Sequence, residues 1–412
     1  MAMSDEESIR PAVEPLSGVR VIDVTQIMAG PFCTMLLGDM GADVIKIEKP
    51  DGGDDVRRSG PPFVAGESAT FLNIGRNKRS VVIDMKRPEG AEIVRGMARV
   101  ADIFVQNLRP GRLEGFGLGY ENVRTVNPAI IYATITGFGR TGPYKDKPGF
   151  DLMAQGLSGI MSVTGHPGQP PVKVSVPITD LNAGLFTAYG ILAAYVNRLK
   201  TGKGQHVDSS LMEAGVAYTM WESAIYFASG RTPGPNGSAH QISAPYQALP
   251  TGDGYITVGG ANQRNWENIC RAIGREELIS DPRFENNAGR MTNRPALEAE
   301  LGKTLKTQPA AHWLSVLEAA GVPCGPINDI AQVYADPQVI ARDMVVEVEH
   351  PTAGTIRNVG IPVKFSETPG SIRRPPPRFA EHTEEVLTEF GYSPEDIDSL
   401  RSQGIVKTLK DV

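Results

Sequence analysis

The stretch GVRVIDVTQIMAGPFCTMLLGDMGADVIKIEKP, residues 18–50, decides the fold. Residues 18–25 and 43–50 are apolar runs rich in β-branched side chains and predict buried strands, and residues 29–42 between them predict a helix. Strand, helix and strand at this spacing form a βαβ unit with parallel strands and a right-handed crossover. The same alternation continues to about residue 140, so the sequence predicts a Rossmann-like, doubly wound α/β layer.

Further elements follow the same patterns along the chain. Strands are predicted at 80–86, 102–108, 130–139, 205–211, 254–260 and 354–365. Helices are predicted at 87–101, near 121–126, at 181–204 and 212–230, across much of 263–320 and at the end of the chain. Residues 231–240 are so rich in Gly and Pro that they predict a loop ahead of a smaller domain. We therefore expect a large domain over 1–225, a small α+β domain over 226–335, and a segment 336–412 that returns to the large domain.

Composition narrows the class of protein. The chain has 412 residues and a net charge of −6. This acidic balance argues against bulk nucleic-acid binding, which needs a basic surface. The cysteines are scattered without a Cys-x-x-Cys pair and the histidines lack ligand spacing, so no metal site is expected. No apolar run approaches the ~20 residues that span a bilayer. The start of the chain is acidic, which is not typical of a secretory signal or of an Arg-rich transit peptide. We expect a reduced, cytoplasmic protein with no membrane partner.

A parallel sheet of this kind first suggests a dinucleotide-binding dehydrogenase. That class carries G-x-G-x-x-G in its first βα turn, whereas the turn here is DVTQIMAGPF. A Walker-A loop is absent as well, so both classes are disfavoured. Basic residues cluster in RNKRS at 76–80, with Lys86 and Arg87 close behind. They are compatible with phosphate contacts or with a solvated loop, and the sequence leaves both open.

Three polar residues sit where chemistry is plausible. Asp180, in VSVPITDLNAGLF, directly precedes the helix predicted from 181. It is a candidate helix N-cap and a candidate nucleophile that the helix terminus keeps ionised, and the two roles do not exclude each other. Asp151 begins another helix-like stretch and carries the same ambiguity. His240 lies in the Gly-rich loop, either as a satisfied surface histidine or as part of a substrate loop.

At these residues the chain resembles the class III CoA-transferase family, which includes formyl-CoA transferase, carnitine CoA-transferase and the α-methylacyl-CoA racemases. The resemblance runs from LSGVRVIDVT to RPPPRFAEHTEEVL, nearly the whole chain. Its markers, specific in combination, are NKRSVVIDMK, VQNLRPG, GLGYENV, ITGFGRTGP, TDLNAG, TGKGQ and GVPCGPIND.

The resemblance implies a site and an assembly. Asp180 matches the family's catalytic aspartate, which forms a mixed anhydride and then a CoA thioester. CoA and acyl-CoA enter as substrates together with a small carboxylic acid, with no tightly bound cofactor. The family also forms an interlocked homodimer with the small domain inserted in the large one. The positions that match CoA-contacting segments are Met28, Lys49, Ile83, Asp84, Met85, Lys86, Asn107, Leu108, Arg109, Phe150 and Asp151.

Two departures refine the activity. Formyl-CoA transferase has a glutamine where this chain has Met28, which weakens the case for formyl-CoA and oxalate. Racemases keep a histidine where this chain has Phe150, and a phenyl ring cannot transfer a proton. A transferase is therefore favoured over a racemase, with a non-catalytic CoA-binding protein as a third reading. The segments that contain His240, Gly259 and Gly260 resemble members that use succinyl-CoA and a dicarboxylic acid, so these three residues are candidate substrate contacts.

Overall fold

The computed structural model of the chain describes residues 14–412, and the fold is described for these residues alone. They form two compact units. The first unit contains the described residues up to Ser158, then Ser175–Tyr218 and Pro337–Val412. The second unit contains Gly159–Val174 and Thr219–Asp336. Each unit has its own sheet and its own hydrophobic core, so each is described separately.

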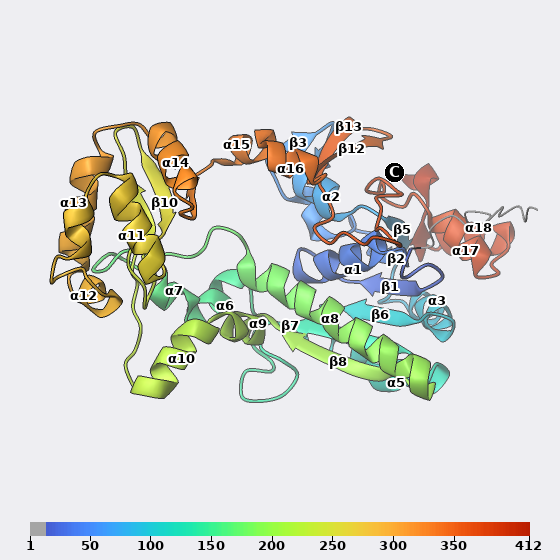
Figure 1. Cartoon of the computed structure of the whole chain (residues 1–412). Helices are drawn as coiled ribbons and strands as arrows, with labels where there is room; N and C mark the ends of the chain where they lie inside the picture. Colours follow the sequence, from blue (N-terminus) through green and yellow to red (C-terminus); the bar gives the residue numbers. More distant parts are fainter. Residues whose placement is uncertain (1–13) are drawn as a thin grey trace, which may run out of the picture. The chain divides into compact units, whose positions relative to one another are not determined.

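A seven-stranded sheet organises the first unit within the described residues (Figure 1). Its strands, in the order β14-β5-β2-β1-β6-β7-β8, are β14 (Val406–Lys407), β5 (Lys78–Ile83), β2 (Asp43–Glu48), β1 (Arg20–Val24), β6 (Ile103–Gln106), β7 (Ile131–Thr136) and β8 (Gln205–Ser210). All neighbours from β5 to β8 pair in parallel, and only β14 runs antiparallel. The strand order reverses between β1 and β6, which is where doubly wound sheets place their ligands. The predicted α/β sheet is confirmed, with an antiparallel edge strand added.

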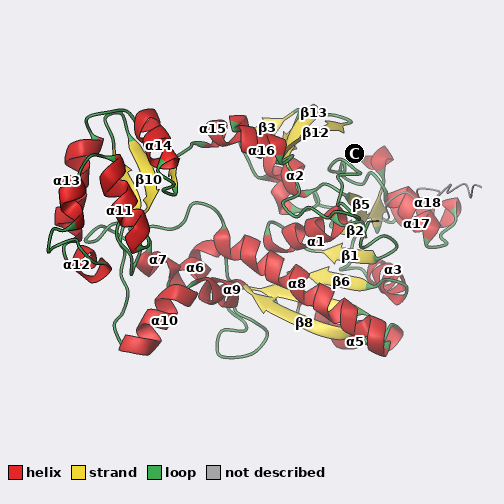
Figure 2. Cartoon of the chain, in the orientation of Figure 1, coloured by secondary structure: helices red, strands yellow, loops and turns green. Residues whose placement is uncertain are grey.

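Helices cover both faces of this sheet. Successive residues of β1 point to opposite faces, so Val21 belongs to one core and Ile22 to the other. The core around Val21 is closed by α1 (Ala29–Asp39) and α8 (Ile178–Thr201), and Figure 2 shows α8 crossing β7 and β8. The opposite core is closed by α3 (Pro88–Arg99), α5 (Tyr120–Val126), α17 (Thr383–Glu389) and α18 (Pro394–Ser402). The carboxyl ends of the parallel strands stay uncovered by these helices, which leaves that edge for a site.

Shorter elements complete the first unit. They are η1 (Asp55–Arg58), β3 (Phe63–Val64), β4 (Glu67–Ser68), α2 (Ala69–Ile74), α4 (Arg112–Gly115), α6 (Asp151–Leu157), α9 (Leu211–Tyr218), α16 (Pro337–Ala341), β12 (Val345–His350), β13 (Gly354–Val359) and η3 (Leu409–Asp411). The strand predicted at 354–365 ends at Val359 and pairs with β12, a strand that the sequence reading missed. The helix predicted at 212–230 is broken at Thr219, where α9 ends and α10 (Met220–Ser229) of the second unit begins.

The second unit is a small α+β body. Its antiparallel sheet contains β9 (Tyr246–Pro250), β10 (Tyr255–Gly259) and β11 (Cys324–Pro326). Its remaining helices are α7 (Ile160–Val163), α11 (Gln263–Ala272), η2 (Glu276–Ile279), α12 (Asn287–Thr292), α13 (Arg294–Leu305), α14 (Ala310–Ala319) and α15 (Ile330–Ala335). Trp266, Phe284 and Leu301 are fully buried at the centre of its core. This core lets the second unit hold its own loops in place.

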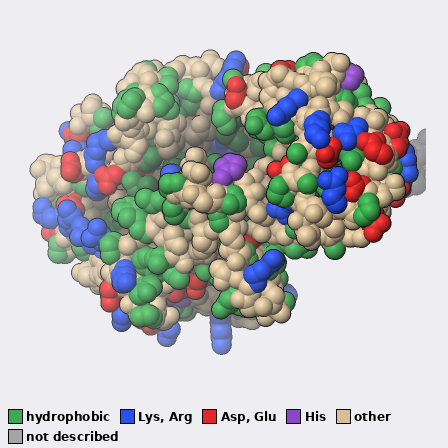
Figure 3. All heavy atoms as spheres, turned by 90° about the vertical axis from the view of Figure 1, so that its left-hand side faces the viewer, with side chains coloured by type: hydrophobic (Ala, Val, Ile, Leu, Met, Phe, Trp, Pro, Cys, Tyr) green, Lys and Arg blue, Asp and Glu red, His purple; other side chains and the backbone are tan. Residues whose placement is uncertain are grey.

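Surface charge is mixed. On the face drawn in Figure 3, Lys and Arg side chains lie close to Asp and Glu side chains, in keeping with a net charge of only −6. Among residues 14–412, no helix is long and apolar enough to cross a membrane.

Candidate active site

A cavity of about 900 Å³ opens at the carboxyl ends of the parallel strands in the first unit. Its wall is formed where β1, β2, β5 and β6 end, because the carboxyl ends of parallel strands meet at one edge of a sheet. The structure brings seven of the predicted CoA-contacting residues together in this wall: Lys49, Ile83, Asp84, Met85, Lys86, Leu108 and Arg109. They come from three separate segments of the chain, so their convergence is a property of the fold and not of sequence proximity.

The wall of this cavity contains four basic and three acidic side chains. Lys49 is paired with Asp55, with 2.6 Å between Nζ and Oδ1. Lys86 and Arg109, by contrast, form no ion pair with any residue from 14 to 412. Unpaired ammonium and guanidinium groups in the wall of a cavity favour a ligand that carries phosphate groups.

The first βα turn, residues 25–28, borders the cavity through Gln26. Two side chains fix this turn. Asn107 accepts a hydrogen bond from the Gln26 amide and donates one to the Gln26 carbonyl, both at 2.8 Å. Asp54 accepts from the amide of Ile27, which has a φ of +70°, an uncommon conformation for a β-branched residue. Asn107 therefore positions the turn and does not line the cavity.

Met28 also lies outside the cavity wall. It is the N-cap residue of α1, and its side chain packs against the buried cluster that contains Met35 and Phe71. Met28, which stands where formyl-CoA transferase has a glutamine, thus makes apolar contacts with this cluster.

Asp180 lies in the first turn of α8, as its third residue. The helix begins at Ile178 with Pro177 at the N-cap and no side-chain cap, so the interpretation of Asp180 as an N-cap is wrong. One turn further along, Gly184 approaches the Ala29 carbonyl so closely that an added Cβ would lie 2.5 Å from that oxygen. Residues four apart share a helix face. The first turn of α8 therefore lies beside the start of α1, directly after the turn that borders the cavity.

Asp151 sets the start of α8. Its Oδ1 accepts from the Thr179 amide at 2.9 Å and from the Thr179 hydroxyl at 2.8 Å, and its Oδ2 accepts from Gln155 Nε2 at 2.7 Å. The Thr179 amide belongs to the first turn, whose amides have no partner inside the helix, so Asp151 satisfies it from outside. Both oxygens of this predicted CoA contact are thus engaged inside the protein. Phe150, the N-cap of α6, keeps an exposed side chain.

The electrostatic state of Asp180 differs from the prediction. Burial, and then the negative charge of Asp151, raise its pKa to about 7. Among residues 14–412 no group donates a hydrogen bond to its carboxylate. The helix terminus therefore does not hold the pKa of Asp180 at or below its ordinary value, although it was expected to favour the ionised form. The same desolvation makes the ionised form a poorly solvated, and so more reactive, nucleophile.

The three candidate substrate residues belong to the second unit. The His240 ring stacks on Tyr246 with centroids 5.1 Å apart and meets Trp221 edge-on at 5.2 Å. The amide of Gly259 donates to the Pro323 carbonyl at 2.7 Å, and that of Gly260 donates to the Pro245 carbonyl at 2.6 Å. Neither glycine amide is therefore free to stabilise an oxyanion in this structure.

The basic cluster at 76–80 has a role that the sequence reading missed. Arg76 pairs with Asp39 at 2.7 Å, Lys78 with Asp23 at 3.2 Å, and Arg79 with Asp43 at 2.7 Å. All three basic side chains are buried. The cluster is thus neither a phosphate site nor a solvated loop; it holds β5 to the neighbouring elements through ion pairs.

Glu48 and Asp54 are further buried groups that no sequence pattern singled out. Glu48 accepts from Arg57 and from the Asp54 amide, and Lys46 approaches Asp54 at 2.8 Å. They fix the segment that follows β2, which carries Lys49 into the cavity wall. No cluster of three or more His, Cys, Asp or Glu side chains able to hold a metal ion occurs among the described residues.

The chain is similar to known proteins over most of its length. The sequence profile described as CoA-transferase family III matches residues 16–383. Succinyl-CoA:glutarate CoA-transferase from Homo sapiens is 41% identical over 395 residues, which cover 96% of this chain and 90% of that protein. Succinate–glutarate CoA-transferase from Agrobacterium fabrum is 39% identical over 396 residues, which cover 94% and 98%. A crystal structure of a CaiB/BaiF family protein from Brucella suis matches with a TM-score of 0.82 and 38% identity, covering 92% of this chain and 99% of that one.

Proposed function

The chain belongs to CoA-transferase family III, and from that premise we propose that it transfers CoA from succinyl-CoA to a dicarboxylic acid of the glutarate class. The activities named for the human and Agrobacterium fabrum relatives support this choice of substrates. The observation that carries the proposal is the placement of Asp180. The first turn of α8, which contains the desolvated Asp180, lies beside the start of α1, and the turn before α1 borders a cavity whose basic residues could contact CoA phosphates.

The proposed reaction is an exchange of one thioester for another. An Asp180 oxygen attacks the carbonyl of succinyl-CoA, the C–S bond breaks, and CoA thiolate leaves a mixed anhydride. The thiolate then attacks the Asp180 carbonyl carbon, which frees succinate and leaves an Asp180–CoA thioester. The acceptor carboxylate displaces the thiolate to form a second anhydride. Attack of the thiolate on the acceptor's acyl carbon releases the new acyl-CoA and restores the Asp180 carboxylate.

These four reaction steps require no net proton transfer, because thiolate and carboxylate are both good leaving groups. Phe150, where a proton-transferring partner of Asp180 would otherwise stand, is consistent with transfer and not with racemisation.

A panel of acceptors tests the proposed substrates. We expect purified enzyme to convert succinyl-CoA and glutarate, or a related C4–C6 dicarboxylate, to the acceptor's CoA thioester and free succinate, as seen by liquid chromatography of CoA esters. Monocarboxylates of equal length serve as the matched controls. Turnover with oxalate alone would contradict the proposed acceptor class. Exchange of an α-proton of an acyl-CoA in deuterated water without an acceptor acid would favour a racemase.

The pH dependence of transfer should report the ionisation of Asp180. Because the carboxylate form is the nucleophile, kcat/KM of the wild type should rise with pH and level off above about 7. Asp151→Asn removes the neighbouring charge while keeping an oxygen for Thr179, so the rise should move to lower pH. Glu121→Gln, on the surface of α5, should leave it in place. A wild-type profile that rises around pH 4, the region of ordinary aspartates, would contradict the assignment.

We also propose that the protein is a homodimer. One side of α8 is buried against the rest of the first unit, while its other side exposes apolar residues at helical spacing. A monomer rarely leaves such a stripe uncovered, and a second copy of this chain would cover it. Light scattering should then give twice the chain mass of 44.3 kDa. A monomeric mass at micromolar concentration would contradict the dimer. The exposed stripe contains Leu185, Phe186, Tyr189, Leu192, Val196 and Leu199.

The chain order of the two units supports one further proposal, that the small domain is an insertion. The first unit includes residues before and after the second unit, and it resumes at Pro337. We propose that dimer formation interlocks the two chains, with the inserted unit of each extending around its partner.

A further inference from the structure

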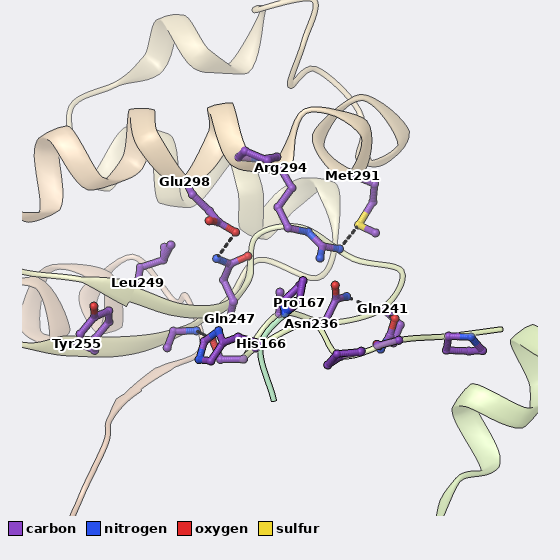
Figure 4. Close-up of a pocket in the computed structure, with 18 of the residues that line it drawn as sticks. His166, Pro167, Asn236, Gln241, Gln247, Leu249, Tyr255, Met291, Arg294 and Glu298 are labelled. Atoms are coloured by element: carbon purple, nitrogen blue, oxygen red, sulfur yellow. Dashed lines mark hydrogen bonds between the residues drawn. The ribbon is translucent and has the colours of Figure 1, made fainter. Parts of the chain in front are cut away.

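A cavity of about 1170 Å³ lies wholly within the second unit (Figure 4). Its wall is made by the loop 231–241, the edge of β9, the start of α13 and a short segment at His166. Pro and Gly fill much of that loop, and Gly237 packs so tightly against the His166 ring that an added Cβ would lie 2.9 Å away. This is a shaped hollow with a fixed wall and not a gap between elements.

Two arginines give this wall an uncompensated positive charge. Arg231 and Arg294 form no ion pair with any residue between 14 and 412. Two other arginines of the second unit are neutralised: Arg275 pairs with Glu300 at 3.0 Å and Arg283 with Asp281 at 2.7 Å. The unpaired arginines of this unit therefore include the two that border the cavity.

Contacts hold the Arg294 side chain in place but do not use all of its hydrogen-bond donors. Its Nη2 donates to the His240 carbonyl at 2.9 Å and contacts Met291 Sδ at 3.3 Å, an interaction drawn in Figure 4. Its Nε is buried and has no hydrogen-bond partner within the described residues. Leaving a buried charged donor unpaired costs stability, and a native structure retains such a group where a ligand or another function uses it.

The one carboxylate in the wall does not neutralise Arg294. Glu298 instead accepts from Gln247 Nε2 at 2.9 Å, as Figure 4 shows, and these two side chains mark another part of the wall. The cavity thus offers a cationic region at Arg294 and a neutral-to-acidic region at Gln247 and Glu298. A ligand with one carboxylate group placed at Arg294 matches this distribution of charge.

We propose that the second unit carries an acid-binding site of its own, in which Arg294 binds a carboxylate of a small organic acid and Arg231 adds a second cationic contact. None of these residues belongs to the unit that contains Asp180. The choice of a dicarboxylic acid as ligand rests on the proposed function, whereas the existence of the site rests on the cavity and its arginines. Through the His240 carbonyl, a bound acid also steadies the loop that contains His240.

Titration calorimetry with glutarate, on the full chain without CoA, tests the site. We expect Arg294→Gln to weaken binding about tenfold or more, because it removes a charge-assisted contact. Arg294→Lys should weaken it less, since lysine keeps the charge and loses the planar fork. Arg283→Gln, which removes an arginine of the same unit outside the cavity wall, should bind as the wild type does. Equal affinity of wild type and Arg294→Gln would overturn the proposal.

A second measurement uses the unmodified sequence, so it holds even if Arg294→Gln folds poorly. Phenylglyoxal labels accessible guanidinium groups, and peptide mass spectrometry locates the label. Glutarate should slow labelling of Arg294 and not of Arg283, whereas the neutral diamide of glutarate should slow neither. Protection by inorganic phosphate as strong as that by glutarate would overturn the carboxylate assignment, and so would absence of protection by glutarate. The CoA-transfer assay does not depend on the labelling experiment. If the wild-type protein shows no CoA transfer while glutarate still protects Arg294, only the proposed function is rejected, and the acid-binding site stands.

Discussion

Asp180→Ala should leave CoA binding intact and reduce kcat for transfer by about a thousandfold or more, the scale seen when a covalent nucleophile is removed. The cavity wall is built from residues after β2, β5 and β6, so the substitution leaves it unchanged. Alanine has no atom that can form the anhydride or hold CoA as a thioester. Asp180→Asn keeps the shape of the side chain and should be equally inactive, which separates loss of the nucleophile from loss of packing.

The covalent intermediate provides the direct readout. After mixing with succinyl-CoA, intact-protein mass spectrometry should show CoA bound to the wild type, and hydroxylamine should remove it and mark Asp180. Both Asp180 variants should show no adduct. Asp398→Ala, which removes a surface carboxylate paired with Arg401, should react as the wild type does. An adduct on another residue, or more than a few per cent of wild-type activity in Asp180→Ala, would show that the nucleophile lies elsewhere.

Glu48→Gln should lower the free energy of unfolding by about 3–5 kcal/mol, the cost of leaving one partner of a buried ion pair uncompensated. Glu48 is buried at the end of β2 and binds Arg57 through two hydrogen bonds of 2.8 and 2.7 Å. It also accepts from Ser80 at 2.6 Å. Glutamine cannot accept all of these bonds, and it leaves the buried Arg57 guanidinium without its carboxylate. The segment after β2, which carries Lys49 into the cavity wall, should become more mobile when the pair between Glu48 and Arg57 is lost.

The pH dependence of this effect has a definite sign. Burial opposes ionisation of Glu48, but Arg57 and Lys46 outweigh it and lower its pKa to about 2, below the unfolded value of 4.5. The stability that Glu48 contributes is therefore present above pH 4.5 and lost as the pH falls toward 2. Urea unfolding of wild type and Glu48→Gln should diverge at pH 7 and converge in acid. Glu347→Gln, at an exposed pair, should change little at either pH; a similar loss there would refute the buried-pair explanation.

The sheet was predictable because its strands are apolar runs with clear boundaries. The βαβ signal at 18–50 is local, and the parallel order follows from it. β14 was not predictable, since two residues carry no periodicity and Val406 finds its partner Ile83 only in the folded sheet. The break at Thr219 likewise interrupts a stretch whose composition favours a continuous helix.

The positions of the candidate site residues were predictable where these residues follow one another in the chain. The segment Ile83–Lys86 directly follows or ends a strand, so its position at the carboxyl edge follows from the sheet. The raised pKa of Asp180 depends on burial and then on the charge of Asp151, which lies 28 residues from Thr179 in sequence and contacts it only through the fold. Arg79 similarly reaches Glu385, 306 residues away. Long-range pairing of this kind leaves no periodic trace in a single sequence.

The antiparallel edge strand β14 has a consequence for how the protein is made. Ile405 and Val406 are fully buried, and the Ile405 carbonyl accepts from the Asp84 amide at 2.8 Å. β5, their partner in the sheet, is synthesised more than 300 residues earlier than β14. Until β14 is synthesised, the nascent sheet carries an open edge next to the predicted CoA site and a gap in its core, the kind of surface that recruits chaperones or neighbouring chains. A variant in which β14 is deleted should therefore aggregate and not behave as a slightly shorter enzyme.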